Sequence, residues 1–173
     1  MSGIEIRDAI PGDADAIGNV VTAAFGQNHE ACLVDRIRAN DEALIELVAT
    51  EPRPTGRGEV VGHALVSPIR LDTRQRDRFA GIAPLSVRPD RQGQGIGSEL
   101  MRAVIDRCSA QNFEAIFLLG DPSYYARFGF VQSHIGNDYG ATEAFMHLEI
   151  EPGILAGIED TAHYVDAFDD EGV

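Results

Sequence analysis

Apolar residues follow strand spacing in some parts of the chain and helical spacing in others. Short alternating or continuous apolar runs predict strands over residues 4–7, 43–49, 59–71, 79–87, 114–119, 144–150 and 163–165, and a short one from Phe130-Val131. Apolar positions three and four apart predict helices from Pro11 to Phe25, around Leu33 and Ile37, from Ile96 to Cys108, and from Asp121 to Gly129. This order predicts a mixed α/β fold with a right-handed strand-helix-strand crossover.

Pro84 interrupts the apolar run 79–87. A proline has no N–H to donate to a neighbouring strand, so it is tolerated in a sheet only at an edge or a bulge. The pattern therefore predicts a strand that is bulged or unpaired at Pro84.

The length of 173 residues and the 44% content of hydrophobic residues indicate one ordinary folded domain spanning residues 1–173. No internal repeat or linker divides it. The last residues are acidic, and we expect them to be frayed.

The net charge of −14 comes from 28 acidic residues against 14 basic ones, all of them arginine. Such a chain lacks the clustered positive charge that binds nucleic acids or anionic membranes, so neither partner is expected. The same overall field would attract a cationic substrate.

Cys32 and Cys108 lie in helical patterns without a partner at disulfide or metal-ligand spacing, and we expect both to be buried. The five histidines are scattered, so no metal is predicted. No apolar stretch is long enough to span a bilayer and no leader pattern is present, which favours a cytoplasmic location.

Three glycines separate the apolar run 79–87 from the helix that begins near Ile96. Glycines allow a ligand to approach the backbone closely, and the N–H groups at a helix N-terminus favour an anion. Arg88 and Arg91 would add positive charge. Ser98 breaks the dinucleotide pattern G-x-G-x-x-G, and the absence of lysine rules out a nucleotide-binding P-loop. The segment therefore predicts a phosphate-binding loop of another kind.

Gln92-x-x-Gly95-x-Gly97, preceded by Leu85-x-Val87-x-Pro89, resembles the pyrophosphate-binding motif of the GNAT superfamily of N-acetyltransferases. A second block, Tyr125-x-x-x-Gly129-Phe130, is similar to an element of many members. Shorter segments, among them Ala83-Pro84-Leu85 and Leu119-Gly120-Asp121-Pro122, resemble the YhbS-like branch of predicted small acetyltransferases. The resemblance covers most of the chain, from about Ile4 to Phe168.

The resemblance implies a mostly antiparallel twisted sheet with one splayed strand pair and helices on both faces, and acetyl-CoA as co-substrate. Its pantetheine arm would enter between the strands ending at Val87 and near Leu119, and Tyr125 would be the general acid. The helix begun by Asp121 would help Tyr125 to carry negative charge. The cofactor-binding residues implied in this way are Leu85, Ser86, Val87, Gln92, Gly93, Gln94, Gly95, Ile96, Gly97, Ser98 and Tyr124.

Several alternatives stay open. The general base could be His63, Glu30 or water. The acyl group could be longer than acetyl, or the chain could bind acyl-CoA as a sensor without turnover. The acceptor is a small-molecule or peptide amine, and the residues that select it are expected in the two N-terminal helices, the loop 50–57 and the segment 134–142. The chain could be a monomer or a homodimer.

Overall fold

The computed structural model describes residues 3–74 and 78–171. The strands are β1 (Glu5–Asp8), β2 (Ile45–Glu51), β3 (Glu59–Leu71), β4 (Phe79–Val87), β5 (Ala115–Leu119), β6 (Val131–Gln132), β7 (Gly136–Asn137), β8 (Phe145–Glu149) and β9 (Thr161–His163). The α-helices are α1 (Ala14–Phe25), α2 (His29–Ala39), α3 (Ile96–Ala110), α4 (Pro122–Tyr125) and α5 (Ala167–Glu171), and 3-10 turns cover Pro11–Asp13, Pro89–Arg91 and Ala126–Phe128.

The strands form one twisted sheet in the order β1-β2-β3-β4-β5-β8-β6, with β9 attached to β3 and β7 to β9. The β4–β5 and β7–β9 pairs are parallel and the other pairs are antiparallel. Helix α3 connects the parallel strands β4 and β5. The predicted mixed α/β fold with a mostly antiparallel sheet is confirmed.

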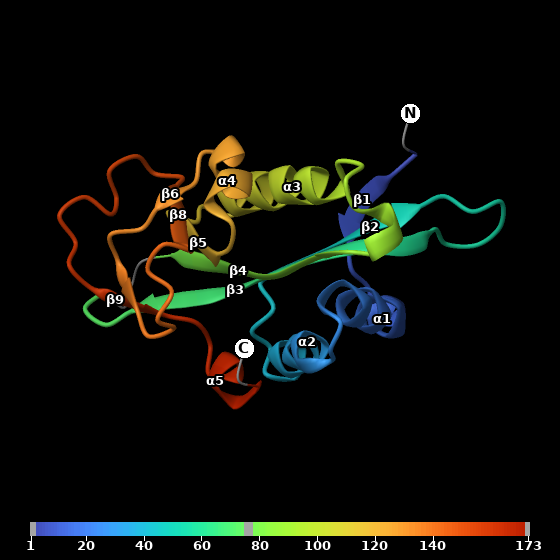
Figure 1. Cartoon of the computed structure of the whole chain (residues 1–173), viewed down its shortest axis with the longest axis horizontal. Coiled ribbons are helices and arrows are strands. Elements are labelled where there is room, and N and C mark those ends of the chain that lie inside the picture. Colours follow the sequence, from blue (N-terminus) through green and yellow to red (C-terminus); the bar gives the residue numbers. More distant parts are fainter. Residues whose placement is uncertain (1–2, 75–77, 172–173) are drawn as a thin grey trace.

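Helices cover both faces of the sheet. Figure 1 shows α3 and α4 on one face, and α1, α2 and α5 on the other. The apolar stripe of α3, including Leu100 and Val104, packs against one face, and Ile17, Val21 and Leu33 of α1 and α2 pack against the other. Close approach of α3 requires Gly62 on β3, because a Cβ there would lie 2.9 Å from a Leu100 methyl carbon.

Strand β4 leaves β5 in the middle of the sheet. It pairs with β5 only from Phe79 to Ile82, whereas its pairing with β3 continues to Val87. The register against β3 shifts where Val66 faces Ile82 and Ala64 faces Leu85. Ala83 and Pro84 therefore form the predicted bulge, and the sheet splits beside it.

The C-terminal region differs most from the sequence prediction. The short strand β7 was not predicted, and β9 begins two residues before the expected position at His163. Residues 167–171, close to the acidic end where we expect fraying, form α5. Ala167 and Phe168 are only 1% and 6% exposed, so these two residues pack the helix against the rest of the protein. The acidic residues around them make this short apolar face hard to recognise in the sequence. Residues 172–173 lie outside the described part.

Two smaller corrections concern the N-terminal half. Strand β2 runs from Ile45 to Glu51 rather than from 43 to 49. Cys32 is exposed, whereas Cys108 is buried as expected. Cys32 precedes the buried Leu33 by one residue, which places it about 100° around the helix from the face that packs on the sheet.

Candidate functional site

Two glycines shape the loop that leads from β4 into α3. Gly93 and Gly95 have φ angles of 74° and 87°, which residues with a Cβ rarely adopt. Gly95 is the N-cap of α3, and its carbonyl accepts a hydrogen bond from the Glu99 N–H at 3.0 Å. The N–H groups before Glu99 in the first turn have no acceptor within the helix, so they are available to an anion.

A cavity of about 450 Å³ opens in front of this loop. It is lined by Leu85, Val87, Arg91, Gln92, Gly93, Gly95, Ile96, Gly97, Ser98, Tyr124 and Arg127. The structure thus brings together the predicted cofactor-binding residues with two exceptions. Ser86 is buried in β4 with its hydroxyl unpaired, and Gln94 is exposed, with its side-chain amide donating to the Asp90 carbonyl at 3.4 Å.

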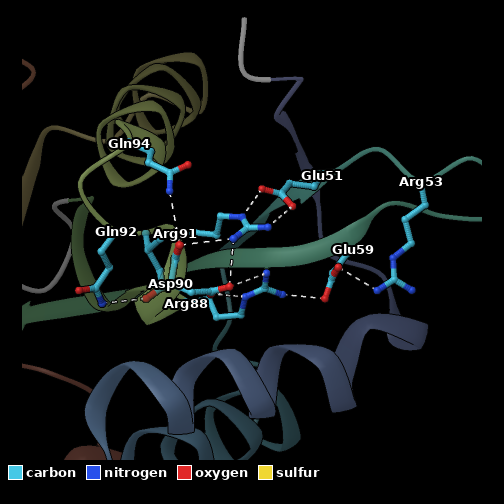
Figure 2. A network of polar contacts seen from close by, with 9 residues as sticks. Glu51, Arg53, Glu59, Arg88, Asp90, Arg91, Gln92 and Gln94 are labelled. Carbon is cyan, nitrogen blue, oxygen red and sulfur yellow. Dashed lines mark hydrogen bonds and ion pairs between the residues drawn. The ribbon is translucent and has the colours of Figure 1, made fainter.

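Arg88 and Arg91 are already neutralised by carboxylates. Figure 2 shows both in one network with Glu51, Glu59 and Asp90. Arg88 donates to Glu59 and to Asp90, each at 2.6 Å, and Arg91 donates to Glu51 at 2.5 Å and to Asp90 at 3.0 Å. Arg88 lines a different cavity, beside α1, so the expectation that it serves the loop is wrong.

Arg127, which the sequence reasoning missed, stands at the loop cavity instead. Its guanidinium carbon lies 4.5 Å from the centre of the Tyr124 ring, a cation–π distance. Tyr124 in turn lies against the start of α3, because a Cβ on Gly97 would be 2.9 Å from the Tyr124 hydroxyl. The sequence does contain a signal for this role of Arg127. It follows Tyr124 by three residues, a spacing that places both side chains on one side of a helical turn.

A second cavity of about 350 Å³ lies on the other side of the split strand pair. It is lined by Phe25, Glu30, Leu33, Ile82, Ala83, Pro84, Leu85, Leu119, Tyr125, Tyr139, Tyr164 and Phe168. Leu85 lines both cavities. Leu85, next to the bulge where β4 leaves β5, therefore forms part of the wall of both cavities.

Tyr125 and Tyr124 face different cavities. Their rings are perpendicular, at 88°, with centroids 4.9 Å apart. The Tyr125 ring is held close to the end of β5, because a Cβ on Gly120 would lie 2.2 Å from Tyr125 Cε2. Asp121 caps α4 by accepting the Ser123 N–H at 2.9 Å, as predicted. The motif pair Tyr124-Tyr125 thus places one phenol at the loop and the other in the second cavity.

Burial, together with smaller contributions from the nearby Tyr124 and Asp121, raises the pKa of Tyr125 to about 12. In this structure α4 is a single turn, and desolvation outweighs the stabilisation of negative charge expected from its N-terminus. The phenol of Tyr125 is therefore protonated at neutral pH and carries a proton to donate, although the raised pKa makes it a weaker acid than a free phenol.

His63 lies in the core and lines neither cavity. It is 0% exposed, and its Nε2 lies 2.7 Å from Glu46 Oε1. Glu46 also accepts from Arg38 Nε at 3.0 Å. Burial lowers the pKa of His63, so the ring is neutral, Nε2–H donates to Glu46, and Nδ1 is left without a partner.

Glu30 is the candidate base that lines the same cavity as Tyr125. Its carboxylate lines the second cavity and accepts hydrogen bonds from Gln27 Nε2 at 3.1 and 3.3 Å. Of the regions expected to select the acceptor, α1, α2 and Tyr139 contribute to this cavity. The loop 50–57 does not: its Arg53 and Arg57 line the cavity beside α1.

Within residues 3–74 and 78–171, no cluster of three metal-ligating side chains occurs. None of the helices in these ranges has the length and hydropathy needed to cross a bilayer.

Comparison with known proteins matches residues 15–130 to the model of the acetyltransferase (GNAT) family. The uncharacterized N-acetyltransferase YhbS of Escherichia coli strain K12 is 35% identical over 126 residues, which make up 72% of each chain. The crystal structure of the Escherichia coli GNAT family N-acetyltransferase YhbS in complex with CoA superposes with a TM-score of 0.90 at 28% identity, covering 98% of this chain and 93% of that one. A GNAT family acetyltransferase from Brucella melitensis, in complex with acetyl-CoA, gives a TM-score of 0.81 at 32% identity, covering 98% of this chain and all of that one.

Proposed function

The chain belongs to the GNAT family of acetyltransferases, and on that premise we propose that it transfers the acetyl group of acetyl-CoA to a primary amine by direct attack, with Tyr125 as proton donor and Glu30 as proton acceptor. The observation that carries this proposal is that Leu85 lines two cavities of different chemistry. One has the chemistry of an anion site, and the other contains Tyr125 and Glu30.

The loop cavity fits coenzyme A. Backbone N–H groups from Gln92 to Ser98 would hold the diphosphate, and Arg127 adds the local positive charge that Arg88 does not supply. Strand β4 has no pairing with β5 beyond Ile82 among the described residues. Its main chain near Leu85 thus has no strand partner on this side and is free to hydrogen-bond the amides of a pantetheine arm, whereas the Val87 carbonyl already accepts from Gln92 Nε2 at 3.0 Å. Relatives whose structures contain CoA or acetyl-CoA support this assignment.

Acetyl-CoA supplies the thioester whose carbonyl carbon is attacked. The chain's residues then handle two protons. Glu30 accepts, directly or through water, the proton that the ammonium must lose before its nitrogen lone pair can form the C–N bond. Tyr125 donates its phenolic proton to the sulfur as the C–S bond breaks, and it is reprotonated, through water, by the second proton that the nitrogen loses as it becomes an amide. The proton held by Glu30 is released to solvent. The net products are an N-substituted acetamide, free coenzyme A and one proton.

The general-acid role is tested with Tyr125→Phe, with Tyr124→Phe as the matched control. Loss of the acid should lower kcat about 10²-fold or more and leave the Kd for CoA unchanged. Tyr124→Phe removes a hydroxyl from the loop cavity instead, so it should weaken CoA binding and spare kcat. A Tyr125→Phe variant that keeps full kcat would show that another group protonates the sulfur.

Turnover is measured as release of coenzyme A across a panel of amines, beside thermal unfolding with and without CoA. A ligand at one hundred times its Kd should stabilise the fold by about 2.7 kcal/mol. Stabilisation by CoA without release in the presence of any amine would favour the predicted alternative, a sensor of acyl-CoA. Faster release from propionyl-CoA or longer thioesters would favour the predicted alternative acyl group.

A further inference from the structure

The second cavity has the composition of a site for a hydrophobic cation. Resting on the proposed function, we infer that the acceptor is a primary amine with a compact apolar body, preferably an aromatic ring, and without a carboxylate. An arylalkylamine has this chemistry. Free amino acids and peptides that present a carboxylate near the amine do not.

The walls of the cavity are apolar and rich in aromatic rings. Ile82, Leu33 and Phe168 supply buried apolar surface, and the Tyr164 ring lies 4.4 Å from that of Phe168 and 5.4 Å from that of Tyr139, measured between centroids. A ring that enters this space gains both apolar burial and edge or face contacts with other rings. The volume of about 350 Å³ is at the lower end for small-molecule sites, so the body must be compact.

The charges that line the cavity are of one sign. Glu30 is an acid, and within the described part of the chain the lining residues include no arginine or histidine. The sequence has no lysine at all, and its net charge is −14. An ammonium is attracted by Glu30 and by the faces of the tyrosine rings. A carboxylate would have no cationic partner in the cavity, and its desolvation would be uncompensated.

The hydroxyl of Tyr164, in the wall of the cavity, lacks a hydrogen-bond partner. Tyr164 is 6% exposed and lines the cavity, and its Oη has no hydrogen-bond partner in the structure. Neighbouring Tyr139 Oη is already engaged, accepting the Tyr164 N–H at 2.8 Å. An unpaired polar group in an apolar wall is costly unless an occupant pairs with it. Because this oxygen is itself buried, an acceptor can pair with it only by displacing part of the aromatic wall.

The aromatic wall is a feature of this chain's C-terminal segment. Tyr139, Tyr164 and Phe168 lie beyond residues 15–130, the part that matches the family. Gly81 on β4 makes room for it, because a Cβ there would lie 2.6 Å from Tyr164 Cε1. Helix α5, which carries Phe168, contacts α2 (Figure 1). The aromatic part of the cavity wall is thus supplied by residues beyond the matched range, whereas its charge comes from Glu30.

The test compares four amines with acetyl-CoA at a fixed concentration. 2-Phenylethylamine is the reference; phenylalanine adds a carboxylate, phenylalaninamide adds a neutral group of the same shape, and ethylamine removes the ring. We expect kcat/KM for 2-phenylethylamine to exceed that for phenylalanine and that for ethylamine by about 30-fold or more, with phenylalaninamide between. Phenylalanine or ethylamine used as well as 2-phenylethylamine would overturn the inference.

A gain-of-function variant tests the charge argument. Phe25 is 44% exposed and lines the cavity, so Phe25→Arg should fold and should supply the missing cation. Its preference for 2-phenylethylamine over phenylalanine should fall about tenfold. Leu44→Arg, at an apolar position 38% exposed outside the cavity, adds the same charge and should not change the ratio. Equal ratios in the two variants would overturn the inference.

Failure of this inference is distinguishable from failure of the proposed function. If CoA stabilises the protein and other amines are acetylated while 2-phenylethylamine is not, the acceptor class is wrong and the acetyltransfer stands. If CoA does not stabilise the protein and nothing is acetylated, the proposed function fails. Calorimetric titration of 2-phenylethylamine then decides the inference alone: saturable binding that Phe25→Arg weakens supports a site for hydrophobic cations, and absence of binding overturns it.

Discussion

Replacing Gly120 with alanine tests how the fold holds Tyr125 in place. Gly120 follows β5 immediately, and a Cβ at this position would lie 2.2 Å from Cε2, 2.9 Å from Cδ2 and 3.2 Å from Cζ of the Tyr125 ring. Real Cβ atoms do not approach that closely, so either the ring or the backbone must move. The ring packs against Tyr124 and Phe130, at 4.9 and 6.1 Å between centroids, so a shift of the ring into the second cavity would break these contacts.

The expected cost follows from overpacking. Forcing a methyl group into a packed site costs about 1–3 kcal/mol, which for a chain of this size lowers Tm by roughly 3–9 °C. Displacing a proton donor by about 1 Å can lower kcat about 10²-fold. Gly120 does not line the loop cavity, so the Kd for CoA should stay within about twofold of the wild-type value, a change too small to report a lost contact.

Gly18→Ala is the matched control. No atom lies within 4 Å of a Cβ built there, and the residue is in the middle of α1, where alanine should stabilise the helix by about 0.5–1 kcal/mol. Differential scanning fluorimetry and steady-state release of coenzyme A give Tm and kcat for both variants. If Gly120→Ala keeps wild-type Tm and kcat, Tyr125 is not held by this contact and the proposed geometry of the proton donor is wrong.

Three further measurements check the electrostatics and burial. Burial holds the pKa of His63 below its ordinary 6.5, so below that pH the unfolded chain binds a proton at this residue that the folded chain does not. The free energy of unfolding should therefore decrease as the pH is lowered below about 6.5. Urea melts of His63→Gln should show a flatter dependence on pH. Arg127→Ala should raise the Kd for CoA about fivefold at low salt, whereas Arg88→Ala, measured by the same titration, should leave it unchanged. A thiol reagent should label Cys32 in the native protein and Cys108 only after unfolding, because burial raises the pKa of Cys108 to about 12; prompt labelling of both would contradict this burial.

Most of the fold was predictable because its elements are long enough for periodicity to show. The 15 residues of α3 repeat their apolar side over several turns, and Pro84 marks the bulge because the missing N–H acts locally. The C-terminal segment was less predictable for the opposite reason. Strand β7 has two residues and α5 has five, too few to establish a period. Their positions are fixed by contacts with distant elements, which a local pattern does not contain.

The site divides in the same way between local and distant information. The loop 92–98 could be found from sequence because glycine and a helix start carry its chemistry within a few residues. Which arginines form ion pairs could not be found from sequence, because this depends on the carboxylates that the sheet brings near. Glu51 and Glu59 are 40 and 29 residues away from the arginines that they bind (Figure 2). In a chain with 28 acidic and 14 basic residues, most arginines find such partners. Arg127 lines the loop cavity because it lies one turn after Tyr124. Its charge is shared there with the neighbouring Asp121, whose pKa it helps to lower, and not with the glutamates of β2 and β3 that bind Arg88 and Arg91.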